Sequence, residues 1–354
     1  MRMVRSAVLA AAAITAIAGA ATAAAPATAA GHPSWRIVKG VGPGSGFPEF
    51  TTITVTSPTS AWAFLAANNN WPTAFELIHG HWLQQGFPVR GDSVVTSLSS
   101  SSATDVWAVS NNFNHLTSKI FRFDGHNWTR LGAFNGSVGP VLALGPTNAW
   151  LFGTGSPSRA LHYNGHTWAP APRGGGLLGG SALSANSIWA YGGNMVAHWN
   201  GHRWASTSVA RQLPKDTQLC GSRLTGIYAA SATNVYAIGT GGCQDQLGPF
   251  VLLHYNGSKW RRVVLDASLG RPNAVISDGH GGLWIPVSTG SPSSGSMEHY
   301  GNGELTTATL PSPGRMVLFD AAIGAHTTTA YAVGFTSKSF SSSTTTAVIL
   351  RYGP

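Results

Sequence analysis

Apolar residues in this chain occur in short runs separated by turn residues, and the same order of runs recurs along the chain. The segment LHYNGHTW at 161–168 is a short strand, an Asn-Gly pair and a tryptophan that opens the next strand. Related segments lie at 121–128, 197–204 and 253–260, with weaker ones at 77–82 and 298–305. Asn-Gly at the centre of a two-residue turn favours the positive φ angles of a type I′ hairpin. The pattern therefore predicts a repeated antiparallel hairpin with a type I′ turn.

A second repeated element precedes each hairpin: a small polar turn, then a strand with an aromatic residue near its centre. The aromatic positions are Trp62, Trp107, Trp150, Trp189, Tyr236, Trp284 and Tyr331, spaced 39 to 48 residues apart. Four short strands in each such period match the blade of a β-propeller. A parallel β-helix is the alternative, but its rungs are shorter and lack these hairpins. We therefore expect an all-β, seven-bladed β-propeller with four antiparallel strands, A to D, in each blade.

The two ends of the repeat region are incomplete in complementary ways. Residues 34–38 read as a D strand with no A, B or C strand before them, and residues 347–354 read as a C strand with no D strand after it. We expect the segment around Trp35 to pair with residues 348–352 and complete the seventh blade. This pairing would close the ring and cover the strand edges that an open sheet exposes.

The first thirty residues read as a secretory signal peptide. Arg2 and Arg5 precede an alanine-rich apolar run at 7–20, and Ala-Thr-Ala at 27–29 fits a cleavage site. A membrane anchor is the alternative, which the short, alanine-dominated run disfavours. We therefore expect a signal peptide at 1–30, one propeller domain at 31–354, and a secreted, extracellular protein with no membrane span after cleavage.

Charge gives little support to nucleic-acid binding. The chain has a formal net charge of +9, but only 9% of its residues are charged. The excess is spread along the sequence, and its longest run is Arg261-Arg262, so no basic stripe is present. Weak adsorption to anionic cell-wall polymers remains compatible with this charge. We expect a monomer.

The histidines and tryptophans have structural explanations. Seven of the thirteen histidines occupy repeat positions beside the C–D turns: His81, His126, His162, His166, His198, His202 and His254. They belong to different blades, so they cannot converge on one ion. We therefore expect no metal and no cofactor, and we expect the repeat tryptophans to pack between blades.

The chain contains two cysteines, Cys220 and Cys243. They flank the predicted A–B hairpin of the fifth blade, where strand A begins and strand B ends. A hairpin centred near Ala232 places them opposite each other, within the separation that a disulfide requires. Secretion supplies the oxidising compartment. We predict a disulfide between them.

The order of aromatic strand, loop, apolar-Tyr, turn and Trp resembles the kelch-type repeats of secreted bacterial propellers, including the propeller domain of galactose-oxidase-like proteins. The resemblance covers the chain after the leader and lies in the layout. The kelch double glycine occurs only at Gly192-Gly193, and segment 277–284 is similar instead to the Asp-box turn of sialidase-type propellers. The resemblance implies a seven-bladed ring but no particular activity, since the fold supports many.

The sequence assigns no catalytic residue. It lacks the extra domain of galactose oxidase, the arginine motif of sialidases, a positioned pair of carboxylates and a G-x-S-x-G elbow. We therefore favour a secreted, non-catalytic recognition protein that binds a glycan, a cell-wall polymer or a protein. The alternative is a secreted lyase or hydrolase with its site at the mouth of the central channel, because propeller sites gather single residues from several blades.

The D–A and B–C loops of a propeller share one face, here called the top face. The B–C loops of this chain are long and variable, as functional loops on a rigid scaffold often are. The candidate ligand-binding residues lie in the first two of these loops: Asn69, Asn70, Trp71, Asn112, Asn114 and His115. Amides can donate to and accept from sugar hydroxyls, and an exposed indole can stack on a sugar or anchor a protein contact. The alternative for Trp71 is that it folds onto its own blade and anchors the loop.

Overall fold

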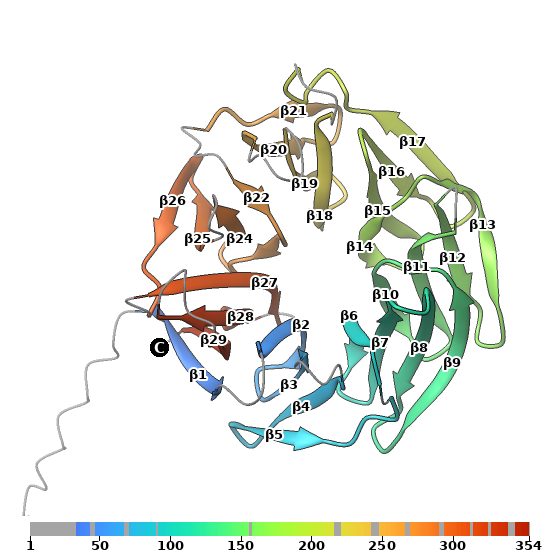
Figure 1. Cartoon of the computed structure of the whole chain (residues 1–354). Helices are drawn as coiled ribbons and strands as arrows, with labels where there is room; N and C mark the ends of the chain where they lie inside the picture. Colours follow the sequence, from blue (N-terminus) through green and yellow to red (C-terminus); the bar gives the residue numbers. More distant parts are fainter. Residues whose placement is uncertain are drawn as a thin grey trace, which may run out of the picture. The chain divides into compact units, whose positions relative to one another are not determined.

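The computed structural model describes residues 33–42, 47–66, 71–89, 91–155, 158–215, 221–241, 248–265, 270–289, 294–311, 314–324, 327–338 and 344–353. All regular structure in these segments is β-strand. The strands form seven sheets arranged as the blades of a ring within the unit Pro33–Pro354, so the propeller prediction is confirmed (Figure 1). Within the described segments, no helix is long and apolar enough to cross a membrane.

Each blade is an antiparallel sheet whose strand A lies nearest the ring centre (Figure 1). Blade 1 contains β2 (Glu49–Ser57), β3 (Ser60–Ala66), β4 (Thr73–Ile78) and β5 (His81–Gln85). Blade 2 contains β6 (Val94–Ser102), β7 (Asp105–Asn112), β8 (Thr117–Phe123) and β9 (Trp128–Asn135). Blade 3 contains β10 (Val141–Gly145), β11 (Asn148–Thr154), β12 (Arg159–Tyr163) and β13 (Trp168–Gly175). Blade 4 contains β14 (Gly179–Ser184), β15 (Ser187–Gly192), β16 (Met195–Trp199) and β17 (Trp204–Ser208).

The remaining blades include two irregularities. Blade 5 contains β18 (Arg223–Ser231), β19 (Asn234–Thr240), β20 (Phe250–Tyr255) and β21 (Trp260–Arg262). In blade 6, strand A is split into β22 (Arg271–Pro272) and β23 (Ile276–Ser277), followed by β24 (Leu283–Thr289), β25 (Ser294–Gly301) and β26 (Glu304–Ala308). Blade 7 contains β27 (Arg315–Ile323), β28 (Ala330–Ser337), β29 (Thr346–Gly353) and, as strand D, β1 (Ser34–Val41) from the other end of the chain.

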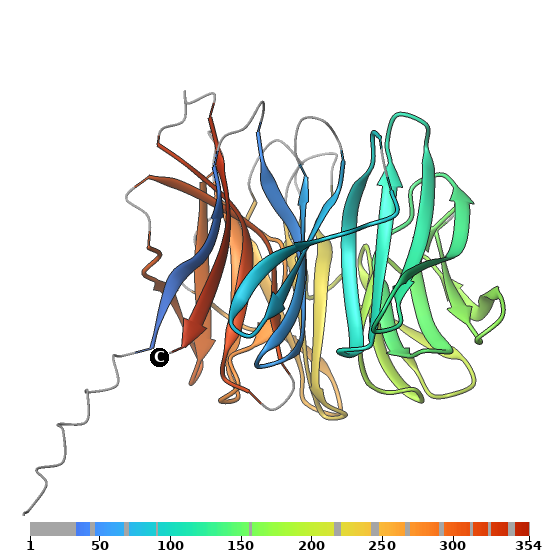
Figure 2. The ribbon, with the colours of Figure 1, turned by 90° about the horizontal axis from the view of Figure 1, so that it is seen from below.

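The pairing of β1 with β29 is the one that the sequence predicts. Trp35 lies opposite Tyr352 in an antiparallel register, which shifts by one residue after Ile37. Both ends of the described chain therefore belong to one blade. Seen from the side, the strands run between two loop-bearing faces (Figure 2).

The turn type predicted for the Asn-Gly hairpins is wrong. At 164–167 only Gly165 has a positive φ, 94°, and Asn164 does not. Four residues separate the paired Tyr163 and Trp168, and the Asn164 side chain accepts hydrogen bonds from the amides of His166 and Thr167 at 3.0 and 2.9 Å. The side chain thus replaces a backbone acceptor, as in an Asx turn.

The two-residue turn with positive φ at both positions occurs instead in the weaker repeats. His79 and Gly80 have φ values of 49° and 81°, and Asn302 and Gly303 have 53° and 85°. Both turns directly connect paired strand residues, which gives the short connection of a type I′ hairpin.

The repeat aromatics pack between blades, as predicted. Trp62 on β3 meets Trp128 of the next blade at 5.3 Å between ring centroids and an interplanar angle of 90°. The same edge-to-face contact between a B-strand aromatic and the next D-strand tryptophan recurs at five further joints: Trp107–Trp168, Trp150–Trp204, Trp189–Trp260, Trp284–Trp35 and Tyr331–Trp82. Such pairs add about 0.5–1.5 kcal/mol each to the burial of apolar area.

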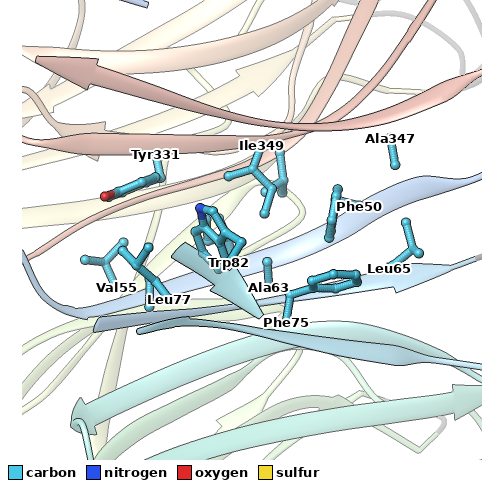
Figure 3. Packing of buried hydrophobic residues seen from close by; sticks show 13 residues of the cluster. Phe50, Val55, Ala63, Leu65, Phe75, Leu77, Trp82, Tyr331, Ala347 and Ile349 are labelled. Carbon is cyan, nitrogen blue, oxygen red and sulfur yellow. The ribbon is translucent and has the colours of Figure 1, made fainter. Parts of the chain in front are cut away.

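The joint between blades 1 and 7 shows how the core is built (Figure 3). Phe50, Phe75 and Trp82 of blade 1 pack with Tyr331 and Ile349 of blade 7 in one buried cluster. Because each blade contributes apolar side chains on both sheet faces, the core consists of a series of such interfaces around the ring.

The C-strand histidines support this packing. His162 stacks on Trp150 with centroids 4.7 Å apart, and its Nε2 lies 2.9 Å from Asn148 Oδ1 at the start of the same B strand. His198 and His254 repeat this arrangement on Trp189 and Tyr236. Their expected structural role is confirmed. Among the described residues no group of three or more His, Cys, Asp or Glu side chains could hold a metal ion.

Candidate functional site

Trp71 is the one tryptophan that the blade interfaces do not bury. All thirteen tryptophans lie in described segments, and Trp71 alone is largely exposed, with 53% of its surface accessible. It precedes β4 by two residues, on the B–C side of blade 1. Thr73 pairs with Leu65 on β3, so Trp71 extends past the top end of the paired strands.

Phe47 lies beyond the same end of blade 1. Leu65 pairs with Phe50 on its other side, and Phe47 is three residues before Phe50. Phe47 is also 53% exposed. Since β2 and β4 flank β3, two strand spacings of about 4.8 Å separate their backbones. The two aromatic residues therefore emerge from neighbouring positions on the top face.

The B–C turn of blade 2 presents two further apolar side chains. Phe113 is 55% exposed and Leu116 is 62% exposed. Leu116 has a positive φ of 48°, and its carbonyl accepts a hydrogen bond of 2.5 Å from Gly136. We call Phe47, Trp71, Phe113 and Leu116 the top apolar patch.

The polar candidates in this turn serve to hold it. Asn112 Oδ1 accepts a 2.8 Å hydrogen bond from the amide of His115, and Asn114 Nδ2 donates one of 3.2 Å to Asp92 in the preceding D–A loop. The structure thus brings Asn112, Asn114 and His115 together and leaves His115 exposed. Asn69 and Asn70 lie outside the described residues, as do Cys220 and Cys243.

The sequence pointed to Trp71, His115 and the asparagines of these loops but did not single out Phe47, Phe113 and Leu116. The available signal was the presence of large apolar residues inside polar, turn-forming segments. Such residues interrupt the repeat as Trp71 does.

The ring centre contains a cavity of about 580 Å³ lined by the A strands. Polar side chains on or between the A-strand segments of six blades hydrogen-bond to the next blade, at 2.7 to 3.2 Å. These bonds join Asp320 to Ile53, Thr52 to Leu98, Ser97 to Val141, Ser181 to Ala229, Thr225 to Pro272 and Asn273 to Leu318. Many of the polar side chains that line the channel therefore hydrogen-bond one blade to the next.

Asp320 is the only acidic side chain among the described residues that line this cavity. Its Oδ2 accepts hydrogen bonds from Thr52 Oγ1 at 2.8 Å and from the Ile53 amide at 3.2 Å. Burial raises the pKa of Asp320 to about 6, although these hydrogen bonds act in the opposite direction. The carboxyl group of Asp320 thus accepts the hydrogen bonds that join the last blade to the first.

Comparisons with known proteins identify the fold but no family. No protein-family model matches the sequence, and no curated protein matches it. Among solved structures, YCF48 bound to D1 peptide is 12% identical, with a TM-score of 0.61 over 90% of this chain and 97% of that chain. YCF48 from Cyanidioschyzon merolae is 16% identical, with a TM-score of 0.60 over 91% and 99%.

A GH74 enzyme from Niastella koreensis has a similar relation to this chain. It is 12% identical, with a TM-score of 0.59 over 88% of this chain and 55% of its own length. Identities this low show a shared propeller architecture and nothing about ligand or chemistry. The resemblance to kelch-type repeats stays a prediction from the sequence.

Proposed function

We propose that this chain is a non-catalytic binding protein that recognises a protein or peptide through the top apolar patch. The observation that carries this proposal is the exposure of Trp71, Phe113 and Leu116, each above one half, in loops anchored on adjacent blades. Aromatic residues are enriched, and charged residues depleted, at the centres of protein–protein interfaces.

A protein ligand fits the patch better than a glycan does. Phe47 and Leu116 offer apolar side-chain surface without hydrogen-bonding groups, while Asn112 Oδ1 and Asn114 Nδ2 already form hydrogen bonds within the loops. Sugar recognition needs free polar groups beside the aromatic surface, whereas an apolar side chain of a partner needs only the surface itself. Other propellers also bind peptides, as YCF48 does with a D1 peptide.

The proposed site of action is outside the cytoplasm. This part of the proposal rests on the leader-like residues 1–30. We expect the mature chain in the culture medium to begin near residue 31. N-terminal sequencing of the protein from the medium, compared with the cell-associated fraction, tests this expectation.

Selection from a displayed peptide library on the immobilised protein tests the binding surface. We expect enriched peptides rich in aromatic and aliphatic residues, whose affinity falls at least about tenfold in Trp71→Ser and in Phe113→Ser, the loss of about 1.4 kcal/mol. Leu83→Ser is the matched control, because Leu83 is 47% exposed but lies on β5, away from the top loops. A parallel arm uses insoluble cell-wall polysaccharide. Retention there that depends on Trp71, without any peptide enrichment, would show a glycan-binding protein and overturn the proposal.

A further inference from the structure

Two arginines lie at equivalent positions on adjacent innermost strands, on the opposite side of the ring from the top apolar patch. Arg223 is the first residue of β18 in blade 5, and Arg271 is the first residue of β22 in blade 6. Both strands start from D–A loops, so both residues lie at the top mouth of the channel.

Hydrogen bonds near the arginines fix the two strands relative to each other. Thr225 Oγ1, two residues after Arg223, donates a 3.0 Å hydrogen bond to the carbonyl of Pro272, which directly follows Arg271. The Leu224 amide, on the other side, donates to Gly193 of blade 4 at 2.8 Å. These contacts place Arg223 beside the B–C turn of blade 4 and fix the starts of β18 and β22 relative to each other.

Tyr191 of blade 4 extends toward the same place. Its ring crosses Gly179, the first residue of the innermost strand of that blade: a Cβ at 179 would lie 2.6 Å from Tyr191 Cε1 and 2.9 Å from its hydroxyl oxygen. Only a glycine leaves room for this path. The tyrosine hydroxyl therefore lies over the first residue of β14, at the end of that strand where the D–A loop joins it.

The electrostatics agree with this placement. Partial desolvation and the nearby charge of Arg223 lower the pKa of Arg271. Burial raises the pKa of Tyr191 to about 12, while the charge of Arg271 acts in the opposite direction. Among the described residues, neither arginine forms a salt bridge with a carboxylate. Two like charges close together repel each other, and an anion between them relieves that repulsion.

We propose that Arg223, Arg271 and Tyr191 form a binding site for an oxyanion, a carboxylate or phosphate group of a ligand, at the channel mouth between blades 4, 5 and 6. Guanidinium groups bind both kinds of oxyanion through paired N–H donors, and the tyrosine hydroxyl adds a third donor. This site goes beyond the proposed function and does not depend on it.

Arg315 provides a matched control. It is the first residue of β27 and so holds the equivalent position in blade 7. Its guanidinium lies over the Phe335 ring of its own blade, 5.3 Å from the ring centroid. Arg315 therefore has the same place at the start of an innermost strand and the same charge as Arg223 and Arg271, but it belongs to blade 7 and not to the proposed site.

Binding of inorganic phosphate and of acetate, followed by calorimetry at pH 7 and matched ionic strength, tests the site. We expect at least one of these probes to bind the wild type, with affinity at least about tenfold weaker in Arg223→Gln and Arg271→Gln and unchanged in Arg315→Gln. Preference for phosphate or for acetate then distinguishes the two oxyanion classes. Binding of neither probe, or equal binding by all the variants, would overturn the proposal.

The melting temperatures of the wild type and the variants, measured in chloride without the probe anions, show whether a loss of binding comes from a loss of stability. Removing one of two repelling charges should leave the melting temperature of Arg271→Gln in chloride unchanged or slightly higher. A clear fall would show that the chain already neutralises the arginines, and would count against an anion site. Tyr191→Phe keeps the packed ring and should weaken binding about threefold to tenfold without unfolding the protein. Trp71→Ser should keep full anion binding, so a failure of either proposal is distinguishable from a failure of the other.

Discussion

Asp320 in the last blade and Thr52 in the first are joined by a 2.8 Å hydrogen bond between side chains at the ring centre. The other described joints that use side chains at this level have neutral serine, threonine or asparagine groups. The joint between the two ends of the repeat array thus contains an ionisable group that the other joints lack.

Asp320 should make stability depend on pH. Burial raises its pKa from 3.8 to about 6 in the folded protein, so the folded state holds the proton more tightly than the unfolded chain. Its contribution to the free energy of unfolding is then fully present below about pH 4, is lost as the pH rises to about 6, and stays lost above it. The shift corresponds to a loss on the order of 3 kcal/mol.

Asp320→Asn removes this titration and keeps an oxygen that can accept the Thr52 and Ile53 hydrogen bonds. We expect the variant to lose less stability than the wild type between pH 4.5 and pH 7.5, measured by urea unfolding. Glu304→Gln, at an exposed carboxyl group on β26, is the control. Parallel stability curves for wild type and Asp320→Asn would show that this carboxyl group does not titrate in that range.

The two kinds of tryptophan should respond differently to truncation. Trp204 is buried to 1% exposure and packs edge-to-face on Trp150 of the preceding blade. Trp204→Ala should cost about 3–5 kcal/mol. Trp71→Ala should cost no more than about 0.5 kcal/mol, since surface changes usually have small effects. Chemical denaturation of both variants compares them, and a large loss at Trp71 would mean that its indole anchors the loop.

Repetition explains why much of the fold was readable in the sequence. The near-constant spacing of seven aromatic strands defines the number of blades and the strand order. The incomplete blades at the two ends of the chain complement each other, which predicts the pairing of the Trp35 segment with the segment that contains Tyr352. The hairpin turn was misjudged because the Asn164 side chain, and not a second positive φ, completes it. Local residue preferences do not distinguish these two solutions.

The candidate site was less accessible to such reasoning. Phe113 and Leu116 are exposed because the turn around them is fixed by Asn112 and Asn114, and this contact network follows from three-dimensional register. Arg223 and Arg271 are separated by about one repeat, so their proximity exists only once the blades are stacked side by side. No local pattern marks either residue.

The disulfide between Cys220 and Cys243 stays a prediction from the sequence, because both cysteines lie outside the described residues. We expect no free thiol in the denatured, unreduced protein. The bridge should contribute about 3 kcal/mol or less to the free energy of unfolding, because the hairpin already holds the two strands together. Finding two free thiols in the purified protein would contradict the bridge.

Strand β1 should be essential to stability because it supplies the fourth strand of blade 7. Trp35 packs on Trp284 of blade 6 and on Tyr352, with ring centroids 5.4 Å away in both cases. Deleting residues 31–40 would expose the β29 edge and remove the indole from that core. We expect the melting temperature to fall by roughly 10 °C or more. Trp35→Phe, which keeps an aromatic ring, should lose much less; equal melting of the deletion and the full chain would exclude a role for β1 in ring stability.

The glycines of the two turn classes should differ in tolerance to a side chain. Gly80, in the two-residue turn, has a φ of 81° but nothing within 4 Å of the position that a Cβ would take, so Gly80→Ala should cost only the backbone strain of about 1–2 kcal/mol. Gly165 has a similar φ of 94°, but its Cβ would lie 2.9 Å from that of Thr147 in the adjacent A–B turn. Gly165→Ala should therefore cost more, because the steric overlap adds to the strain. Thr147→Gly should recover the added part in a double-mutant cycle and have no such effect on Gly80→Ala. Equal losses for the two alanine variants would show that the A–B and C–D turns do not pack closely enough to require glycine.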